Sequence, residues 1–544
     1  MLPFKTLERV IGASPVRQAL DSAFSRYAAH RVKSLDGLSI AMQQTETLLK
    51  LVRKARHTRF GRQHGFATIR TVADYQRQVP LRHYEDFWTE YWQPSFPALR
   101  DVTWPGEIPY LALSSGTTSG TTKYIPVSRE MLRSNRRAAF TALAWFDAAH
   151  PGSRLFSGRT LFLGGSTDLQ RASRSGHREM GTSTTTQRGR APLMGDLSGI
   201  AAHEFPGFMR PFVFPPLDLA LATDWEFKLK RMAELSARLP ITAVSGVPSW
   251  LLVLFEVLRK QTGRETIAEV WPTLKLVIHG GTRFDPYRTL FQKVVGGENV
   301  RFLETYPASE GFVAAEDPRH ERLRLITDHD VFFEFVLTDE LDQDRPTRHT
   351  VADFVPGVPY AVVLTTCAGL WSYVLGDTVC FESRDPPLLR FTGRTSQYLS
   401  AFGEHLIGEE IERAVACAAE ATDASVVDFH VGPAFPEASG AVGHHRYFVE
   451  FATLPHSTIE FASEIDAALS RTNEDYRAHR VGDLTLNMPE VVRVPGGGFA
   501  NWMQSRGKLG GQNKVPRMDN SGQMTQDLEK WLQRESTREL PRSA

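Results

Sequence analysis

The sequence has few cysteines and no long hydrophobic run. Its three cysteines, Cys367, Cys380 and Cys417, are too few among 544 residues for a disulfide framework or a zinc cluster. We therefore expect free thiols in a reducing compartment, which favours a cytoplasmic location. The longest apolar stretches, such as 250–258, fall far short of the ~20 residues that span a membrane, and the first residues lack the apolar core of a signal peptide. We expect neither a membrane segment nor a cleaved leader.

The chain also lacks an excess of charge of either sign. Lys and Arg number 63 against 62 Asp and Glu, a formal net charge of +1. Such a balance provides no overall attraction to nucleic acid or to an anionic membrane. Short basic stretches such as 134–140 carry no aromatic platform for bases. We expect no nucleic-acid partner.

Several common catalytic motifs are missing as well. The sequence contains no His-Glu-x-x-His, no Cys-x-x-Cys and no Gly-x-Ser-x-Gly. The adjacent residues His444 and His445 would point to opposite faces of a strand, so they are not expected to share a metal ion. Metalloprotease, dithiol and serine-hydrolase chemistries therefore have no support.

The residues that are present indicate a globular α/β protein. Hydrophobic residues make up 42% and charged residues 23% of a chain too long for one core, so we expect two to four domains. Strands and helices alternate between residues 128 and 311, which predicts a sheet with parallel strands. Strands are predicted to begin the segments 159–166, 241–260, 274–282 and 300–311, and helices are predicted at 128–149, 224–239 and the second half of 241–260.

Ligands of such sheets bind beyond the carboxyl ends of the strands. Three turns rich in glycine or hydroxyl groups fall at predicted strand ends, at 114–122, 280–282 and 306–311. The nearly continuous apolar run that precedes the second turn is typical of a parallel strand buried on both faces. We expect these three turns to border the binding site.

The predicted secondary structure changes further along the chain. From about residue 330 it becomes strand-rich, and beyond Arg394 a smaller region follows the pattern helix, strand, strand, helix. We expect a large domain at 1–394, a hinge at 395–403 and a small α+β domain at 404–544. The small domain contains a glycine-rich stretch at 494–517.

The stretch "LALSSGTTSGTTKYIPVS" (111–128) holds the most unusual of the three turns. An apolar strand leads into a run of Ser, Thr and Gly that ends at Lys123. Hydroxyl groups, a pliable backbone and one ammonium group suit a phosphate. The spacing lacks the Gly-Lys-Ser/Thr ending of a P-loop, however. By itself the run is equally compatible with an ordinary connection.

Further segments along the chain form, in their order, a series that is more specific than any one of them alone. They are "ETYPASEG" (304–311), "WSYVLGD" (371–377), "FTGR" (391–394) and "QNKVPR" (512–517), with "SGVPSWLLVLFE" (245–256) and "HGGT" (279–282) between them. Together with the Ser/Thr/Gly run, this series resembles the adenylate-forming superfamily. It most resembles the plant auxin-responsive Gretchen Hagen family of acyl acid amido synthetases and its bacterial relatives. The resemblance extends over essentially the whole chain.

The resemblance implies that ATP activates a carboxylic acid, with Mg²⁺ as the metal. It assigns Glu310 to Mg²⁺, because a carboxylate beside phosphate oxygens suits this cation. It places Tyr306 against the adenine and Ser309 at the α-phosphate, and it gives the ribose to Asp377 with help from Arg394. The residues that it places around the phosphates and the nucleotide floor are Ser114, Ser115, Thr117, Thr118, Lys123, Gly280, Gly281 and Thr282.

Lys514 corresponds to the C-terminal lysine of the family, which reaches the phosphates when the small domain closes. A compact ammonium group suits such a clamp. Considered alone, Lys514 would be a solvated lysine, and Lys508 is the alternative candidate. One departure is visible after the hinge, where the plant enzymes carry Asp-Lys-Thr-Asn-Glu and this chain has Glu404 and His405. Glu404 is a candidate for the second half-reaction, whereas a structural role for His405 is favoured.

The acyl pocket is the least defined part of the site. Trp250, Phe255 and Phe312 are candidate lining residues, with core packing as the favoured alternative for each. We expect a monomeric enzyme that joins a small carboxylic acid to an amine, with an amino acid as the first candidate. Two alternatives are open: transfer of the acyl group to a thiol, or a non-catalytic relative that senses nucleotide or acid. Retention of Glu310 and Asp377 with the lysine argues against the sensor.

Overall fold

The computed structural model describes most of the chain. It covers residues 14–115, 122–164, 169–172, 191–222, 224–280, 284, 288–341, 343–395, 398–399, 401–402, 404, 406–435, 443–473, 476–477, 480, 486–506, 515–520 and 522–538.

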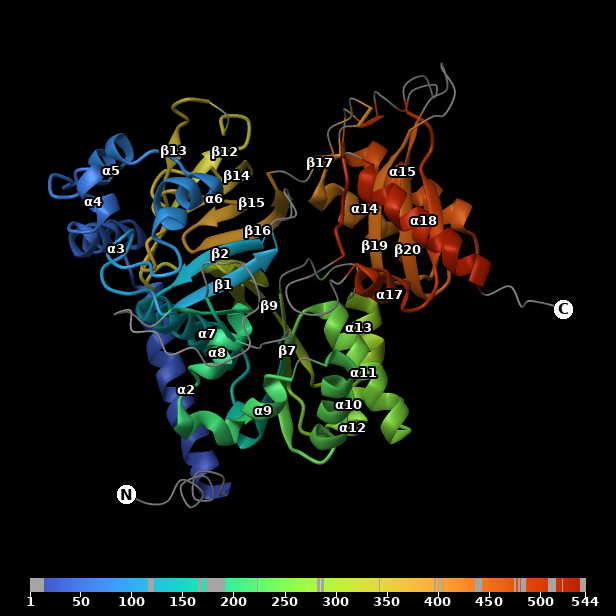
Figure 1. Cartoon of the computed structure of the whole chain (residues 1–544). Coiled ribbons are helices and arrows are strands. Elements are labelled where there is room, and N and C mark those ends of the chain that lie inside the picture. Colours follow the sequence, from blue (N-terminus) through green and yellow to red (C-terminus); the bar gives the residue numbers. More distant parts are fainter. Residues whose placement is uncertain are drawn as a thin grey trace.

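A 12-stranded sheet forms the centre of the large domain, in the order β13-β12-β14-β15-β16-β11-β10-β9-β8-β7-β3-β6 (Figure 1). One half is parallel, as the sequence predicts. Its strands are β3 (Arg159–Leu163), β6 (Val213–Phe214), β7 (Ile241–Gly246), β8 (Leu276–Gly280) and β9 (Arg301–Pro307).

Helices cover both faces of the parallel half. In β8, Leu276 packs with residues of α7 (Arg129–Ala149) on one face, and Val277 packs among the helices of the other face. Both side chains are 0% exposed. The near-continuous apolar run of this strand thus has the two-sided burial expected of it. The helices of the second face are α9 (Leu217–Ala220), α10 (Trp225–Ser236), α11 (Pro248–Thr262), α12 (Ile267–Val270) and α13 (Arg288–Val295).

The other half of the sheet is antiparallel. It includes the strands that the sequence predicts after residue 330. The change of direction occurs at the hairpin between β9 and β10, so the turn 308–311 lies where the two halves meet. The antiparallel strands are β10 (Phe312–Asp317), β11 (Arg322–Leu325), β12 (Val331–Leu337), β13 (Arg348–His349), β14 (Pro359–Thr366), β15 (Tyr373–Arg384) and β16 (Pro387–Arg394).

A second, four-stranded sheet has the order β2-β1-β5-β4. Its strands are β1 (Tyr110–Ser115), β2 (Thr122–Val127), β4 (Gln170–Arg171) and β5 (Leu193–Gly195), followed by α8 (Leu197–His203). β1 and β2 form an antiparallel hairpin on either side of residues 116–121. The unusual run of Ser, Thr and Gly is therefore flanked by two strands, whereas a P-loop joins a strand to a helix.

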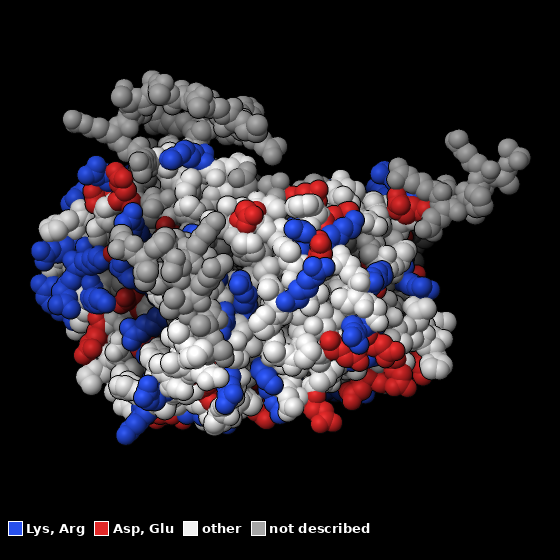
Figure 2. Space-filling model, turned by 90° about the horizontal axis from the view of Figure 1, so that it is seen from below, with Lys and Arg blue, Asp and Glu red and all other residues white. Residues whose placement is uncertain are grey.

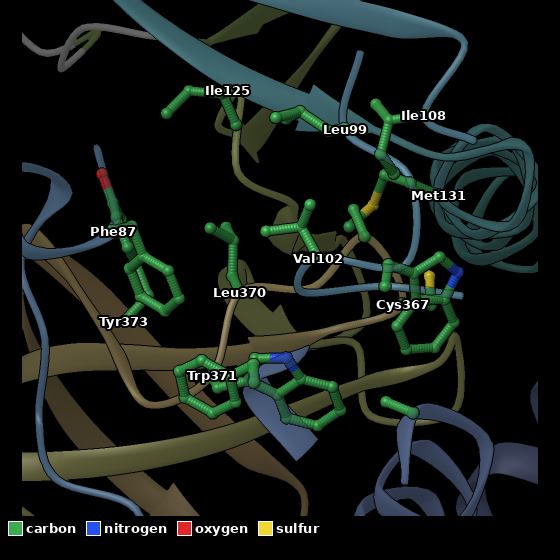
Figure 3. Close-up of a cluster of buried hydrophobic side chains, with 14 of the residues drawn as sticks. Phe87, Leu99, Val102, Ile108, Ile125, Met131, Cys367, Leu370, Trp371 and Tyr373 are labelled. Atoms are coloured by element: carbon green, nitrogen blue, oxygen red, sulfur yellow. The ribbon is translucent and has the colours of Figure 1, made fainter. Parts of the chain in front are cut away.

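A hydrophobic core connects this hairpin to the antiparallel half of the large sheet. Ile125 of β2 and Met131 of α7 belong to the same buried cluster as Tyr373, the first residue of β15, and Trp371, which precedes the strand (Figure 3). Phe87 lies against Tyr373, with ring centroids 6.1 Å apart. The cluster also receives the N-terminal helices α3 (Ile40–Ala55), α4 (Arg59–Gln63), α5 (Val72–Gln78) and α6 (Tyr84–Phe87).

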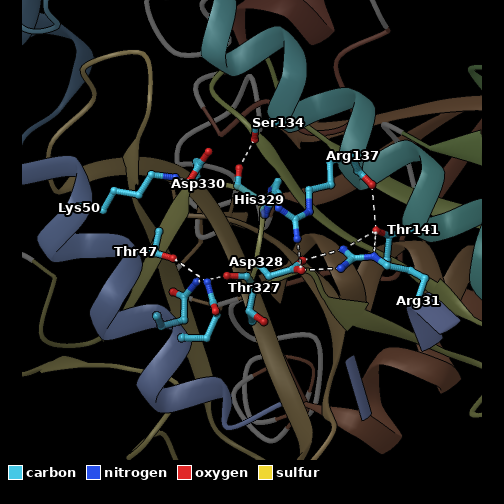
Figure 4. A network of polar contacts seen from close by, with 12 residues as sticks. Arg31, Thr47, Lys50, Ser134, Arg137, Thr141, Thr327, Asp328, His329 and Asp330 are labelled. Carbon is cyan, nitrogen blue, oxygen red and sulfur yellow. Dashed lines mark hydrogen bonds and ion pairs between the residues drawn. The ribbon is translucent and has the colours of Figure 1, made fainter. Parts of the chain in front are cut away.

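A polar network attaches three helices to the segment between β11 and β12. Asp328 accepts hydrogen bonds from Arg31 of α2 (Ser14–Asp36) and from Arg137 of α7, each with an N–O distance of 2.7 Å (Figure 4). Gln44 of α3 donates to the Thr327 carbonyl at 2.6 Å. Because Asp328 is buried, its paired charge stabilises one arrangement of these helices on the sheet.

The C-terminal part has its own core and lies at one end of the large domain, near α11 and α13 (Figure 1). Its sheet, in the order β19-β20-β21, comprises β19 (Ser425–Ala434), β20 (His444–Thr453) and β21 (Glu490–Val494). Helices α14 (Gly408–Ala421) and α15 (Thr458–Thr472) cover one face, and α17 (Gly498–Ser505) with α18 (Gln523–Arg538) covers the other. The short strands β17 (Tyr398–Leu399) and β18 (Leu406–Ile407) pair just before α14.

The sequence predicts the helix–strand–strand–helix pattern of this domain but not β21, α17 or α18. In the described part of the chain, no helix combines the length and the apolar character needed to cross a membrane.

Candidate functional site

Glu310 occupies a tight turn at the point where the sheet changes direction. The backbone groups of Ala308 and Gly311 exchange hydrogen bonds of 2.9 and 3.2 Å, so only Ser309 and Glu310 lie between them. Both of these side chains are buried. The Tyr373 hydroxyl donates to Glu310 Oε1 at 3.0 Å. The turn thus presents a buried carboxylate that a single phenol contacts.

Burial raises the pKa of Glu310, and this effect exceeds the opposing ones of the Tyr373 hydroxyl and the Lys123 charge. A carboxylate removed from water gains strongly from a nearby cation. The position is therefore suited to binding positive charge.

A second group of contacts lies on β9, β15 and β16. The Tyr306 hydroxyl donates to Asp377 Oδ2 at 2.8 Å, and Arg394 Nε lies 3.1 Å from Asp377 Oδ1. The antiparallel register places Asp377 directly opposite Arg394, and the left-handed backbone at Gly376 (φ +85°) precedes the carboxylate. Asp377 Oδ1 is buried and accepts no hydrogen bond from the described residues. This oxygen can accept a hydrogen bond from a ligand hydroxyl.

Tyr306 is itself only 8% exposed, and its ring meets the edge of Phe391 at 5.5 Å between centroids. Burial, with the Asp377 charge beside it, raises the pKa of the hydroxyl well above its usual value. Tyr306 is therefore a neutral donor that holds Asp377 in place, a role that the resemblance does not assign to it.

The β1–β2 hairpin brings a cation to the same region. Lys123 pairs in register with Ser114, and Ser115 at the end of β1 pairs with Thr122. Lys123 Nζ lies 5.3 Å from the centre of the Tyr84 ring, and its charge acts on Glu310. The lysine that follows the Ser/Thr/Gly run therefore lies within electrostatic reach of Glu310, as the predicted site requires.

Gly280 ends β8, but its small size serves the sheet first. A Cβ atom at this position would lie 2.3 Å from the carbonyl oxygen of Thr305 on β9. The Thr305 hydroxyl donates to the preceding His279 carbonyl at 3.0 Å. The close approach of two strands therefore requires glycine here. This explanation is additional to the prediction that the absent side chain admits a ligand.

Several predicted site residues lie outside the described residues. They are Thr117, Thr118, Gly281, Thr282, His405, Lys508 and Lys514, and of Ser115 only the backbone is described.

The segment that follows Lys514 is firmly attached to β19. The backbone of Val431 accepts from Asp519 N at 3.0 Å and donates to Arg517 O at 2.9 Å. His430 contributes a ring nitrogen hydrogen bond to the Pro516 carbonyl at 2.6 Å. The Arg517 guanidinium forms an ion pair with Asp428 and lies 4.4 Å from the centre of the Phe429 ring. The motif "QNKVPR" thus ends in residues that fix the chain directly after its lysine.

Glu404 is buried rather than presented to a ligand. It is 0% exposed, its Oε1 lies 2.7 Å from Nε2 of the buried His445, and its Oε2 accepts from Phe402 N at 2.8 Å. Although burial raises the pKa of Glu404, the contact with His445 lowers it below the usual value. His444 pairs instead with Glu490 at 3.0 Å. The two adjacent histidines thus point apart, as the sequence predicts.

The three aromatic residues considered for the acyl pocket have different surroundings. Phe255 is 0% exposed between Trp271 and Phe291, so it belongs to the core under α11. Trp250 is half-buried in the first turn of α11. Phe312 follows the Glu310 turn, is 8% exposed, and packs on the α7 face of the sheet. Phe312 is thus adjacent to the site in the chain, whereas Phe255 is not part of it.

Sequence reasoning missed two members of this group, Tyr373 and Tyr84. Tyr373 belongs to a motif that the sequence analysis quotes, but its contact with Glu310 depends on the pairing of β14 with β15. Tyr84 lies in a stretch with the composition of an ordinary helix. No local signal distinguishes Tyr84, because its neighbours Lys123 and Tyr373 are distant in the sequence.

Comparison with known families decides the relationship of the chain. Residues 39–201 match the GH3 family N-terminal domain, 324–394 the GH3 family central domain and 409–523 the GH3 family C-terminal domain. The matched regions together cover more than half of the chain. The chain belongs to the GH3 family.

Individual GH3 proteins are distant in sequence. The chain is similar to the 4-substituted benzoates-glutamate ligase GH3.12 of Arabidopsis thaliana, with 27% identity over 213 residues. That alignment covers 36% of this chain and 37% of the ligase, so it spans well under two thirds of the relative's length.

Solved structures show the same fold over nearly the whole chain. The GH3.15 acyl acid amido synthetase superposes with a TM-score of 0.73 at 17% identity, and the match covers 92% of this chain and 94% of the other. The 2-hydroxyisobutyryl-CoA ligase, solved in a postadenylation state with 2-HIB-AMP, gives a TM-score of 0.55 at 13% identity, with 96% and 93% covered. The GH3 fold is thus seen here as a variant of the fold of adenylate-forming enzymes.

Proposed function

We propose that this GH3 protein is an ATP-dependent ligase that activates a small carboxylic acid as its adenylate and transfers the acyl group to an amine, of which an amino acid is the first candidate. The observation that carries the proposal is the grouping of two buried carboxylates, Glu310 and Asp377, near Lys123, where the parallel strands end. The names of the relatives support it, since one is a benzoate–glutamate ligase and another an acyl acid amido synthetase.

The proposed reaction has two steps. A carboxylate oxygen attacks the α-phosphorus of ATP, and pyrophosphate leaves with the electron pair of the broken bond. The amine nitrogen then attacks the acyl carbon, and AMP leaves while the nitrogen loses a proton. In-line positioning and stabilisation of charge on the phosphates are what the protein has to supply.

The described residues are suited to these tasks. Lys123, with Ser114 opposite it, would hold the phosphates, and Asp377 would accept hydrogen bonds from the ribose through Oδ1, which accepts none from the described residues. Arg394 and the Tyr306 hydroxyl would keep that carboxylate oriented. Ser309, beside Glu310 in the turn, would contact the α-phosphate.

We propose Mg²⁺ as the metal and Glu310 as its protein ligand. No cluster of three or more His, Cys, Asp or Glu side chains among the residues described here could hold a metal ion. A single buried carboxylate fits a cation that takes its other oxygens from phosphates and water. Mg²⁺ would neutralise phosphate charge, while Tyr373 keeps the Glu310 carboxylate oriented.

We also propose a division at Arg394, with residues 395–403 as a hinge. The separate cores of the two parts support it. Closure of the small domain would bring Lys514 to the phosphates for adenylation, and opening would admit the acceptor amine.

The free thiols of Cys367, Cys380 and Cys417 agree with a cytoplasmic location.

The first experiment is pyrophosphate release with ATP and Mg²⁺ across aromatic and aliphatic acids, each with and without pooled amino acids. We expect release to depend on the acid and to rise with an amino acid, together with an amide detected by mass spectrometry. Acid-dependent release followed by a thioester with coenzyme A, but no amide, would exclude the proposed acceptor. No release with any acid would exclude the ligase.

The lysine assignment is tested with Lys514→Ala in each half-reaction. We expect adenylation to fall by about 100-fold, as for removal of one preorganised charge at a transition state. Transfer from preformed acyl-adenylate to the amine should fall much less, because pyrophosphate has left by then and no phosphoryl transfer remains. Lys508→Ala is the matched control and should retain both steps. Equal losses in the two half-reactions of Lys514→Ala would contradict the assignment.

A further inference from the structure

The N-terminal helices carry a concentration of positive charge that the overall balance conceals. Residues 47–73 contain seven Lys or Arg and neither Asp nor Glu, in a chain whose net charge is +1. The seven are Lys50, Arg53, Lys54, Arg56, Arg59, Arg62 and Arg70. They fall on α3, on α4 and on the connections that follow these two helices. A local excess of this size repels itself unless anions offset it.

Among the residues that the structure describes, only the two lysines of this segment have carboxylate partners. Lys50 pairs with Asp330 and Lys54 with Glu130, each at 2.6 Å. Arg53, Arg56, Arg62 and Arg70 form no ion pair with any of the residues that the structure describes. All four side chains are exposed. Their charge is consequently available to a ligand.

The four arginines surround one hollow, which we call the arginine hollow. It has a volume of about 770 Å³ and is lined by these arginines with His57, Gly61 and Gly65 and by the apolar residues Leu49, Phe66, Ala67 and Ile69. Phe66 and Ile69 are nearly fully buried and form a fixed floor. The volume is in the range of sites for small molecules.

Hydrogen bonds to the protein's own backbone hold three of the guanidinium groups. Arg53 Nε donates to the Leu49 carbonyl at 3.1 Å, and Arg70 Nη1 donates to the Ala67 and Ile69 carbonyls at 2.8 and 3.0 Å. Arg62 donates to the His57 carbonyl. Each bond uses one or two of five N–H donors, so the others remain for an anion. Anchoring reduces the side-chain entropy that binding would cost.

The arginine hollow is separate from the candidate site. In Figure 1, α3, α4 and α5 lie at the edge of the large domain opposite the small domain, whereas Glu310 lies in the turn after β9 and Asp377 lies on β15. In Figure 2, Lys and Arg side chains gather at the same edge of the molecule with few acidic side chains between them. The candidate site therefore does not explain this charge.

We propose that the arginine hollow binds a small molecule that carries two or more phosphate groups. Guanidinium groups match phosphate oxygens in geometry and form charge-assisted hydrogen bonds with them. Four arginines around one hollow supply charge for several phosphates, and the apolar floor accepts the carbon part of such a ligand. A concave site of this volume suits a compact polyanion better than an extended nucleic acid, which would require a basic groove with exposed aromatic side chains.

Inorganic tripolyphosphate is the probe, and calorimetry measures its binding to the full-length chain. Because Lys123 would also attract this anion, the comparison is made in the Lys123→Ala background. We expect the Arg56→Ala/Arg62→Ala pair to weaken the binding that survives there by 10-fold or more, since it removes two sets of charge-assisted hydrogen-bond donors. Arg77→Ala is the matched control, because Arg77 is exposed on α5 but paired with Asp74. It should change affinity less than 2-fold, because the charge of Arg77 is already offset by Asp74 and Arg77 does not line the hollow.

Two further measurements distinguish the ligand class. Vesicles containing phosphoinositides, compared with neutral vesicles, separate a phosphorylated lipid headgroup from a free phosphate; binding of either kind that requires Arg56 and Arg62 supports the arginine hollow. Acid-dependent pyrophosphate release should be unchanged in Arg56→Ala/Arg62→Ala without tripolyphosphate, so failure of this proposal is distinct from failure of the ligase. Equal tripolyphosphate affinity of the Lys123→Ala protein with and without the arginine substitutions would overturn the proposal. So would binding of RNA or polyglutamate at this surface without tripolyphosphate binding.

Discussion

Glu310 is a candidate site residue whose buried carboxylate lowers the stability of the folded protein when it is charged. Its carboxylate is buried in a turn, and one phenol hydroxyl is its side-chain hydrogen-bond partner in the described structure. The elevated pKa indicates that the protein disfavours the charged form. A group kept under such conditions is typical of a functional site rather than of a structural ion pair.

We predict that Glu310→Gln stabilises the ligand-free protein as it removes activity. Because the folded pKa is raised, the stability of the wild type is greatest below the ordinary pKa and is lost as the pH rises through the folded one. The melting temperature of the variant should equal that of the wild type near pH 4.5 and exceed it by about 2 °C at pH 8. Adenylation should fall by about 100-fold. Thermal unfolding and pyrophosphate release measure the two effects.

Glu316→Gln is the control for this prediction. Burial also raises the pKa of Glu316, on the adjacent strand β10, but its carboxylate accepts from the backbone of Glu304 rather than facing the candidate site. This variant should keep activity. A Glu310→Gln protein with ordinary activity, or one less stable at pH 8 than at pH 4.5 relative to the wild type, would contradict the role given to Glu310.

At the scale of elements, the pairing of strands decides which motifs meet. β9 and β15 do not pair with each other in the sheet, yet the Tyr306 hydroxyl on β9 donates a hydrogen bond to Asp377 on β15. The β1–β2 hairpin belongs to a different sheet, and the core shared with Trp371 and Tyr373 holds it over the Glu310 turn. Three motifs from separate elements thus form one group through packing rather than through spacing along the chain.

The contact between β8 and β9 leads to a prediction about Gly280. Gly280→Ala would place a Cβ atom 2.3 Å from the Thr305 carbonyl, so one of two paired strands must move. We expect a loss of about 2 kcal/mol or more in the free energy of unfolding, as is usual for overpacking against a rigid neighbour. Chemical denaturation followed by circular dichroism measures it.

Gly496→Ala is the matched control, because a Cβ atom there would meet nothing within 4 Å. Its stability should equal that of the wild type. If Gly280→Ala were as stable as Gly496→Ala and only ATP binding fell, the glycine would serve the ligand rather than the sheet.

At the scale of the whole molecule, the two parts are held by different cores that meet near the end of β16. Arg390 of β16 contacts Glu409 of α14, and Gly393 (φ +142°) lies against Gly408 at the start of that helix. Just beyond, the buried pair of Glu404 and His445 fixes the chain to β20. The connection is therefore short and its far end is anchored, which suits rigid-body rotation of the small domain.

We predict that a fragment of residues 1–394 folds without the small domain. Its core clusters lie almost entirely within those residues. The fragment should unfold cooperatively and bind ATP more weakly than the full chain, and it should not release pyrophosphate, because Lys514 is absent. Calorimetry of unfolding and of ATP binding measures these properties. A fragment that is unfolded or aggregated would contradict the division at Arg394, and a fragment with full adenylation would contradict the role of Lys514.

Much of the fold follows from local pattern. Ser128 precedes α7 and its hydroxyl accepts from Met131 N at 3.0 Å, so the helix begins where a capping residue predicts it. The apolar runs that end in glycine or hydroxyl residues become β7, β8 and β9. The helix α17 was missed because it lies in a glycine-rich stretch. It forms since Phe499, Trp502 and Met503 pack on the small sheet, and this contact is invisible locally.

The sequence by itself determined the family, the alternation of strands and helices, and the residue types at the candidate site, because short motifs and periodic hydrophobicity are local properties. Only the tertiary structure decided that Tyr306 supports Asp377, that Phe255 belongs to the core, that Glu404 pairs with His445, and that four arginines surround one hollow. Each of these facts depends on which distant segments become neighbours. Burial and electrostatic pairing are properties of that neighbourhood, and they act through distances that no spacing along the chain specifies.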